Sequence, residues 1–172
     1  MLNFPQFSSK PQPIPPQPGQ ESVWDYPRPA IWQPTDQLIQ VICNGVTLAE
    51  THQGKRVLET SHPPTYYIPP EDVQPEYLEA TAHQTRCEWK GRCRYFNVTV
   101  GDRSLPQVAW QYIDPTPPFA DLLNHFAFYA GPMDACYVGG ERVTPQDGQF
   151  YGGWITASVV GPFKGGPGTM GW

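Results

Sequence analysis

Proline and glycine interrupt this chain so often that a long helix cannot form in it. The 172 residues include 22 prolines and 16 glycines. Proline breaks helices and central strands because it lacks the amide hydrogen and its ring fixes φ. The segments between these interruptions are short and rich in aromatic residues, for example VWDYPRP, CEWKGRCRYFNV and FYGGW. This pattern predicts a mainly β domain with tight turns and few, short helices.

Turn dipeptides separate the segments that we expect to pair as strands. An Asn-Gly pair at 44–45 lies between LIQVIC and VTLAE, a Gly-Asp pair at 101–102 follows RCRYFNVTV, and a Gly-Gly pair at 139–140 precedes ERV. Such residues tolerate the positive φ of a hairpin turn. Three hairpins predict an antiparallel meander rather than βαβ units, and KRVLET, after a turn at 52–54, is expected to be a further strand.

Alternation along RCRYFNVTV assigns its two faces. Phe96, Val98 and Val100 share an apolar face, which we expect to lie in the core. Cys93 and Tyr95 share the mixed face, which we expect to line a cleft or meet solvent. Helix is expected in two places: two brief turns in PPEDVQPEYLEA, where prolines start and restart the helix, and a short helix at 119–126.

Composition divides the chain into three parts. Residues 1–20 are rich in proline and glutamine and predict an extended arm, which is either a ligand for a proline-recognising domain or a spacer. No arginine flanks these prolines, which favours the spacer. Residues 21–160 form the expected β domain. The glycine-rich tail at 161–172 either wraps the domain, with Phe163 or Trp172 as an anchor, or is loosely ordered.

Charge and hydropathy restrict the partners and the location. The net charge of −5 offers no basic surface for nucleic acid. No apolar run approaches the roughly 20 residues that span a membrane, and the first residues lack the apolar core of a signal peptide. We therefore expect a cytoplasmic protein with reduced cysteines, and the sequence gives no oligomeric state.

No motif in the sequence specifies a reaction. The histidines and cysteines lack the close pairing of a zinc site, and neither a phosphate-binding glycine loop nor a nucleophile elbow is present. We therefore expect no metal and no cofactor. Cys87 and Cys93 flank a Lys-Gly turn and form either a thiol pair or ordinary packing.

The surplus of large aromatic side chains is the best indication of function. Buried Tyr and Trp each need a partner for their polar atom, so many of them together predict an aromatic-lined pocket for a small-molecule ligand. The carboxylate of Glu59 is either a binding or acid–base group beside His62 or a salt-bridge partner of Arg56 or Arg28. The residues expected to line the pocket are Glu59, His62, Tyr66, Tyr67, Trp89, Lys90, Trp110 and Tyr129.

Other functions stay open at this point. Lys90, Arg92 and Arg94 either bind an anionic end of the ligand or keep a strand edge soluble. The pocket could belong to an enzyme that uses Glu59 or His62 as general acid–base. The proline-rich arm or exposed rings could instead dock a protein partner.

The order and spacing of these segments resemble the bacterial domain-of-unknown-function family 427, across roughly residues 21–154. The matching segments are ESVWDYPRP, VICNGVTLAET, RVLETSHPPTYYIPPEDV, CEWKGRCRYF, AWQYIDP, FAFY, DACYVGGERV and FYGGW. The resemblance implies a β-tent fold, in which two antiparallel sheets lean together at an angle and leave a cleft between them. The family is sometimes labelled nucleotidyltransferase-like, but paired metal-binding aspartates on one strand are missing here. Phe96 also stands where a tryptophan is common. The resemblance implies no established activity.

Overall fold

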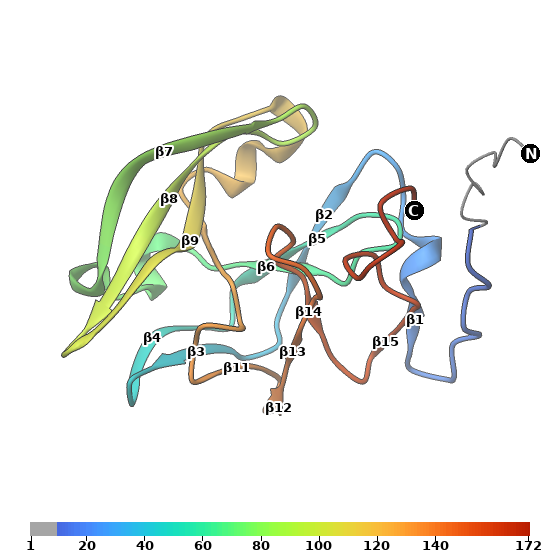
Figure 1. Ribbon diagram of the computed structural model, residues 1–172, viewed down its shortest axis with the longest axis horizontal. Helices are drawn as coiled ribbons and strands as arrows, with labels where there is room; N and C mark the ends of the chain where they lie inside the picture. Colours follow the sequence, from blue (N-terminus) through green and yellow to red (C-terminus); the bar gives the residue numbers. More distant parts are fainter. Residues whose placement is uncertain (1–9) are drawn as a thin grey trace, which may run out of the picture.

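Antiparallel sheets make up most of the regular secondary structure of the protein, and its helical segments are single 3-10 turns or short runs (Figure 1). The computed structural model describes residues 10–172. A mainly β fold was predicted from the frequent prolines and glycines, and it is confirmed. No helix within 10–172 is long and apolar enough to cross a membrane.

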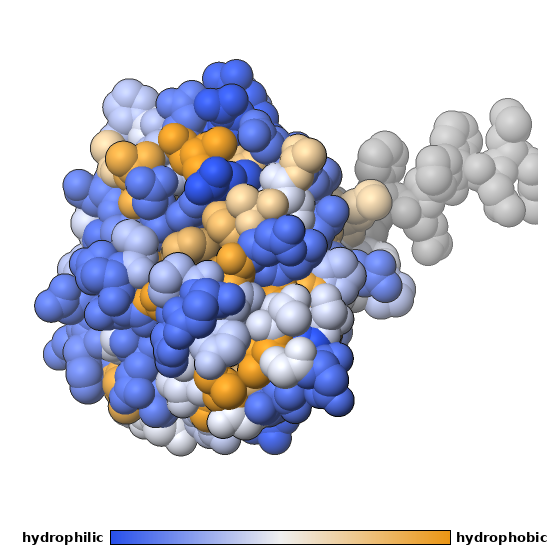
Figure 2. All heavy atoms as spheres, turned by 90° about the vertical axis from the view of Figure 1, so that its left-hand side faces the viewer, coloured by the Kyte–Doolittle hydropathy of each residue, from blue (hydrophilic) through white to orange (hydrophobic). Residues whose placement is uncertain are grey.

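The first large sheet is a meander of consecutive antiparallel strands in the order β10-β9-β8-β7. Its strands are β7 (Leu78–Cys87), β8 (Gly91–Val100), β9 (Arg103–Pro115) and β10 (Phe126–Phe128). The pair at 101–102 forms the predicted turn between β8 and β9. The edge strand β7 lies on a side of the molecule that is mostly hydrophilic (Figure 2), and most of its residues are exposed or half-buried.

The second large sheet has the order β12-β11-β3-β4. Its strands are β3 (Ile39–Cys43), β4 (Val46–Thr51), β11 (Ala135–Val138) and β12 (Glu141–Arg142). Asn44 and Gly45 form the β3–β4 turn with φ values of 46° and 76°, which only residues that tolerate the left-handed region adopt readily. The hairpins predicted at 44–45 and 139–140 are both confirmed.

A third sheet, in the order β2-β5-β6, continues the first one. Its strands are β2 (Ile31–Thr35), β5 (Gly54–Leu58) and β6 (Thr65–Tyr67). The backbones of Ile68 and Phe126 exchange two hydrogen bonds of 2.8 Å, so β6 runs beside β10. Together the two sheets form one curled sheet in the order β2-β5-β6-β10-β9-β8-β7.

KRVLET forms the predicted strand, β5, but it does not extend the preceding hairpin. It pairs with β2 and β6, because the turn after β4 leads the chain into the third sheet. Two short pairs complete the fold. The strands β1 (Glu21–Ser22) and β15 (Val159–Val160) are parallel, and β13 (Thr144–Pro145) and β14 (Trp154–Ile155) are antiparallel.

Each face of the curled sheet covers a separate core. Phe96, Val98 and Val100 of β8 point into the first core, which fills the space between the curled sheet and the second sheet, so their predicted burial is confirmed. These two sheets are inclined to one another and converge at one end (Figure 1). The opposite face of the curled sheet carries the second core, which includes Cys93 and Trp110.

The helical turns follow the prolines. The turns η2 (Pro70–Asp72) and η3 (Pro75–Tyr77) are the two brief turns predicted there, and η1 (Val23–Asp25) is a third. The short helix expected at 119–126 is present as η4 (Pro117–Leu122), but it ends four residues earlier than expected. Asn124 has a φ of 60°, which turns the chain so that Phe126 can begin β10 beside Ile68.

The two ends of the described chain meet. Residues 10–20 contain no helix or strand, and the amide of Ile14 donates to the carbonyl of Gly161 at 2.9 Å. The rest of the arm expected at 1–20 lies outside the described residues. In the glycine-rich tail, Phe163 packs against the small core formed by Val23 and its neighbours. The ring of Trp172 lies 5.8 Å from that of Trp24. The tail thus wraps the domain.

Candidate functional site

A pocket of about 410 Å³ lies on the face of the curled sheet that carries the second core. Every strand from β5 to β9 contributes to its lining. The loop of residues 146–153, which connects β13 to β14, lies across from this wall, and we call it the roof loop. The space between the two large sheets is filled by the first core. The aromatic cleft therefore lies inside the curl rather than between the two large sheets.

Trp110 on β9 is the centre of the aromatic wall. It is buried, and its indole N–H donates to the hydroxyl of Tyr67 at 3.3 Å. The Trp110 ring lies 4.7 Å from the ring of Tyr129 and 6.5 Å from that of Tyr95. Tilted arrangements at these distances are favourable for aromatic pairs. The result is a fixed set of rings facing the pocket.

Hydroxyl and thiol groups lie at the edge of this wall on β7 and β8. The Thr85 hydroxyl contacts the Cys93 sulfur and the Tyr95 hydroxyl, each at 3.1 Å. Burial raises the pKa of Tyr95 to about 12, so this phenol is neutral at ordinary pH. Cys87 and Cys93 both line the pocket as free thiols. The residue directly opposite Cys93 is Thr85, whereas Cys87 lies opposite Gly91.

Glu59 and His62 lie together on the loop between β5 and β6. A carboxylate oxygen of Glu59 is 3.8 Å from Nδ1 of His62. Nδ1 lies 2.9 Å from the Thr60 carbonyl, which accepts its proton and leaves Nε2 unprotonated in the neutral ring. Burial lowers the pKa of His62, and the charges of Lys164 and Lys90 add to this effect while Glu59 opposes it. The histidine is therefore neutral near pH 7.

The salt bridge considered for Glu59 is made by another carboxylate. Arg56 donates to both carboxylate oxygens of Glu21, at 2.6 and 2.9 Å. Such a two-point contact matches the planar guanidinium to the carboxylate. Glu59 therefore lines the pocket, with His62 as its neighbour.

Two lysines reach the pocket from segments far apart in sequence. Lys90 lies in the β7–β8 turn, and Lys164 lies in the segment after β15. Among residues 10–172, no Asp or Glu carboxylate lies within 4 Å of either ammonium group. The Lys164 ammonium lies 5.7 Å from the centre of the Tyr151 ring and donates to the Trp172 carbonyl at 3.2 Å.

The arginines expected near an anionic ligand face elsewhere. Arg94 donates twice to the side-chain oxygen of Gln111, at 3.1 and 2.9 Å, on the face of the first core. Alternation places the Arg92 side chain on this same face of the curled sheet, which is opposite to the face that lines the pocket. Arg86 is the cross-strand partner of Arg92, so its side chain leaves the pocket wall as well, although Arg86 borders the pocket.

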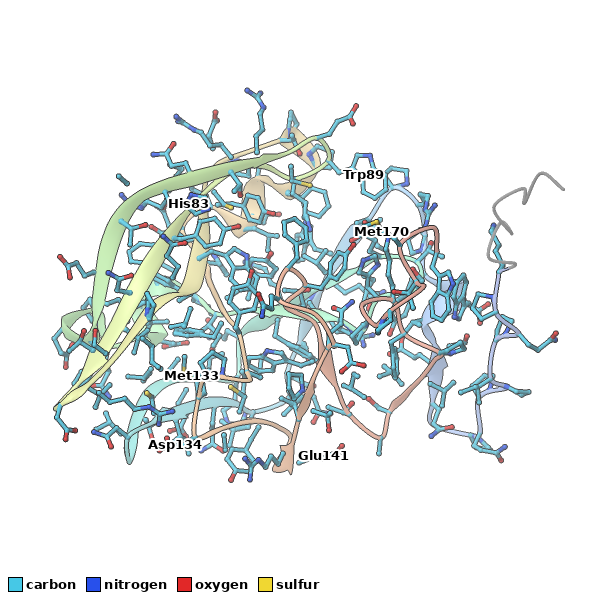
Figure 3. All side chains as sticks on the ribbon, viewed as in Figure 1. His83, Trp89, Met133, Asp134, Glu141 and Met170 are labelled. Atoms are coloured by element: carbon cyan, nitrogen blue, oxygen red, sulfur yellow. The ribbon has the colours of Figure 1, made fainter. Side chains whose placement is uncertain are left out.

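The structure brings together six of the eight residues predicted for the site. Tyr66 points to the opposite face, where its ring stacks on Trp154 at 5.4 Å. Trp89 lies at the tip of the β7–β8 hairpin (Figure 3) and packs against the second core without lining the pocket. The six that line the pocket are Glu59, His62, Tyr67, Lys90, Trp110 and Tyr129.

A second, larger hollow of about 920 Å³ lies on the other side of the third sheet and is bordered by Tyr66. Several of its polar groups contact one another. Arg56 pairs with Glu21, and the Lys55 ammonium lies 2.9 Å from Nε2 of His125. In the described part of the chain, no group of three or more His, Cys, Asp and Glu residues could hold a metal ion.

Fold and site together define a mainly β protein with an aromatic pocket inside a curled sheet. The chain belongs to the family described as domain of unknown function (DUF427), with the short name NTP_transf_9, whose model matches residues 31–139. A comparison with curated proteins finds no match. The matched region contains the six predicted pocket residues, but it ends before the roof loop and Lys164.

Proposed function

We propose that this protein binds a small molecule in the pocket around Trp110. The main support is the arrangement of the rings: Trp110, Tyr67 and Tyr129 are held in one wall opposite the roof loop. The volume of about 410 Å³ falls in the range of ~300–1,000 Å³ that is typical of small-molecule sites. A flat ring system stacked on these side chains would suit both the size and the lining.

A ligand-observed NMR screen of small aromatic compounds tests this proposal. We expect binders whose signals broaden in the presence of the protein, and we expect Trp110→Ala to abolish the effect. The control is Trp24→Phe, because Trp24 lies outside the pocket and donates to the Pro162 carbonyl. The absence of any binder at millimolar concentration would contradict the proposal.

An enzyme on the same pocket is the second candidate, and the pairing of Glu59 with His62 supports it. The neutral ring exposes an unprotonated Nε2 that could accept a proton, and Glu59 could stabilise the resulting cation. The separation of 3.8 Å exceeds a hydrogen bond, so the pair would have to tighten in a complex. His62→Gln should then abolish turnover of a bound compound while preserving its binding. A loss of binding alone would assign His62 to recognition.

We expect a cytoplasmic protein, and the four cysteines support this because all of them are free thiols, of which three are buried. Burial raises the pKa of Cys136 to about 12, which keeps this thiol protonated and inert.

A further inference from the structure

We propose that the ligand of this pocket carries an acidic group beside its ring system, and that Lys90 and Lys164 bind this group from two different walls. This inference rests on the proposed function, because it names the class of compound that the aromatic pocket takes. The acidic group would be a carboxylate or a phosphate, both of which present negatively charged oxygens to an ammonium group.

The charge of the pocket is opposite to that of the whole chain. The sequence has a net charge of −5, yet the charged side chains facing the pocket are two lysines and one carboxylate, Glu59. This carboxylate lies beside His62. Neither lysine has an Asp or Glu carboxylate within 4 Å in residues 10–172. The composition does not explain this local excess of positive charge, whereas an anionic ligand does.

Lys164 is held in place rather than free in solvent. Its amide donates to the Ser61 carbonyl at 2.9 Å, and its carbonyl accepts from the Gln146 side chain at 2.6 Å. The ammonium group is fixed between the Tyr151 ring and the Trp172 carbonyl. A partly buried cation without an Asp or Glu partner is stabilised when a ligand anion joins it. The ligand would supply this anion.

The two lysines and the aromatic rings would contact different parts of the same ligand. Lys90 follows Trp89 in the β7–β8 turn, beside Cys87 of the pocket wall, and Lys164 lies on the side of Ser61 and His62. Both lysines lower the pKa of His62 through their charges, so they act on the same end of the pocket. Because the family match ends at residue 139, Lys164 adds to the site a cation from outside the matched domain.

Three flat, nearly isosteric probes separate charge from shape. Calorimetric titration at low ionic strength compares benzoate, which is anionic, with neutral benzamide and cationic benzamidine. We expect benzoate to bind about tenfold more tightly than benzamide, since charge-assisted hydrogen bonds are about twice as strong as neutral ones. Benzamidine should bind most weakly. Added salt should weaken benzoate and leave benzamide unchanged.

Variants assign the effect to the two lysines. Lys90→Gln and Lys164→Gln should each reduce benzoate affinity by roughly threefold to tenfold without changing benzamide. Arg92→Gln is the matched control, because this cation lies two residues from Lys90 but on the outer face. Equal melting temperatures of Lys90→Gln, Arg92→Gln and the parent would show that the pocket is intact.

Each outcome bears on the inference. Phenyl phosphate, titrated in parallel, distinguishes a phosphate preference from a carboxylate preference, and either preference supports it. If benzamide binds as tightly as benzoate, the ligand need not be an acid, and the inference is overturned while the aromatic pocket stands. If Arg92→Gln weakens benzoate as much as Lys90→Gln, general surface charge explains the effect. If no probe binds at millimolar concentration, both proposals fail.

Discussion

At the scale of single residues, the titration of His62 makes the stability of the protein depend on pH. Burial lowers the pKa of this histidine in the native protein, whereas the unfolded chain has an ordinary value near ~6.5. At pH values between these two pKa values, the unfolded state binds more protons than the native state does. The free energy of unfolding therefore falls as pH drops below ~6.5, by at most about 1.4 kcal/mol for each unit of pKa difference.

His62→Gln should flatten this part of the stability curve. The groups that set the titration are Glu59, Lys90, Lys164 and the Thr60 carbonyl, and all of them remain in the variant. Burial also lowers the pKa of His125, so some pH dependence should persist. Urea unfolding between pH 5 and 8 measures the effect, with the exposed His52→Gln as the control. A parallel shift of the whole curve, with no change in slope, would disprove it.

Most of the pocket wall could be predicted from individual residues. Alternation along β8 places the side chain of Tyr95 on the other face of the sheet from Phe96. Buried Tyr and Trp side chains also need partners for their polar atoms. The position of Lys164 could not be predicted. It depends on the tail crossing back to Ser61 and Gln146, and nothing local in a glycine-rich segment indicates such a contact. For a related reason the sequence left open whether Arg94 binds the ligand, because sequence proximity to Lys90 does not reveal which face a side chain occupies.

At the scale of elements, the roof loop determines how the pocket is closed. Gly152 lies so close to the Trp110 ring that a Cβ atom placed there would be 2.2 Å from a ring carbon. The Tyr129 hydroxyl donates to the Phe150 carbonyl at 3.2 Å, which holds the loop near the wall. Gly152→Ala should push the loop away from Trp110 and destabilise the protein by about 1–3 kcal/mol, as overpacking commonly does.

Gly131→Ala is the control for this change, because a Cβ atom at Gly131 would meet nothing within 4 Å. Acrylamide quenching of tryptophan fluorescence should increase in Gly152→Ala and stay unchanged in Gly131→Ala. Benzoate affinity should fall in parallel with the increase in quenching. Equal quenching in both variants would mean that the loop does not shield Trp110.

The hairpins were predictable because each depends on two adjacent turn residues, whereas the pairing of β5 and the end of η4 were not. The strand β5 pairs with β2, which lies before the preceding hairpin in the chain, and η4 ends where the chain turns to place Phe126 beside Ile68, with which it exchanges two hydrogen bonds. Those bonds convert two separate sheets into the curled sheet. The same curl places the pocket on its inner face, which local strand propensity cannot indicate.

At the scale of the whole molecule, the tail stabilises the domain from outside the region matched to the family. Phe163 packs against the small core that contains Val23 and Leu58, and the Trp24 indole donates to the Pro162 carbonyl at 2.9 Å. A chain ending at residue 160 loses these contacts and Lys164 together. We expect its free energy of unfolding to drop by roughly 1–3 kcal/mol, since Phe163 and Trp172 are half-buried aromatic side chains.

A chain ending at residue 164 separates the two contributions of the tail. It keeps Phe163 and Lys164 but loses the contact between Trp172 and Trp24, so its stability should lie closer to that of the full chain. It should also keep more of the preference for benzoate over benzamide than the chain ending at 160, which lacks Lys164. If both truncated chains melt at the same temperature as the full chain, the tail is dispensable for the fold. In that case, the boundary of the domain lies before residue 161, and the packing of Phe163 contributes little to stability.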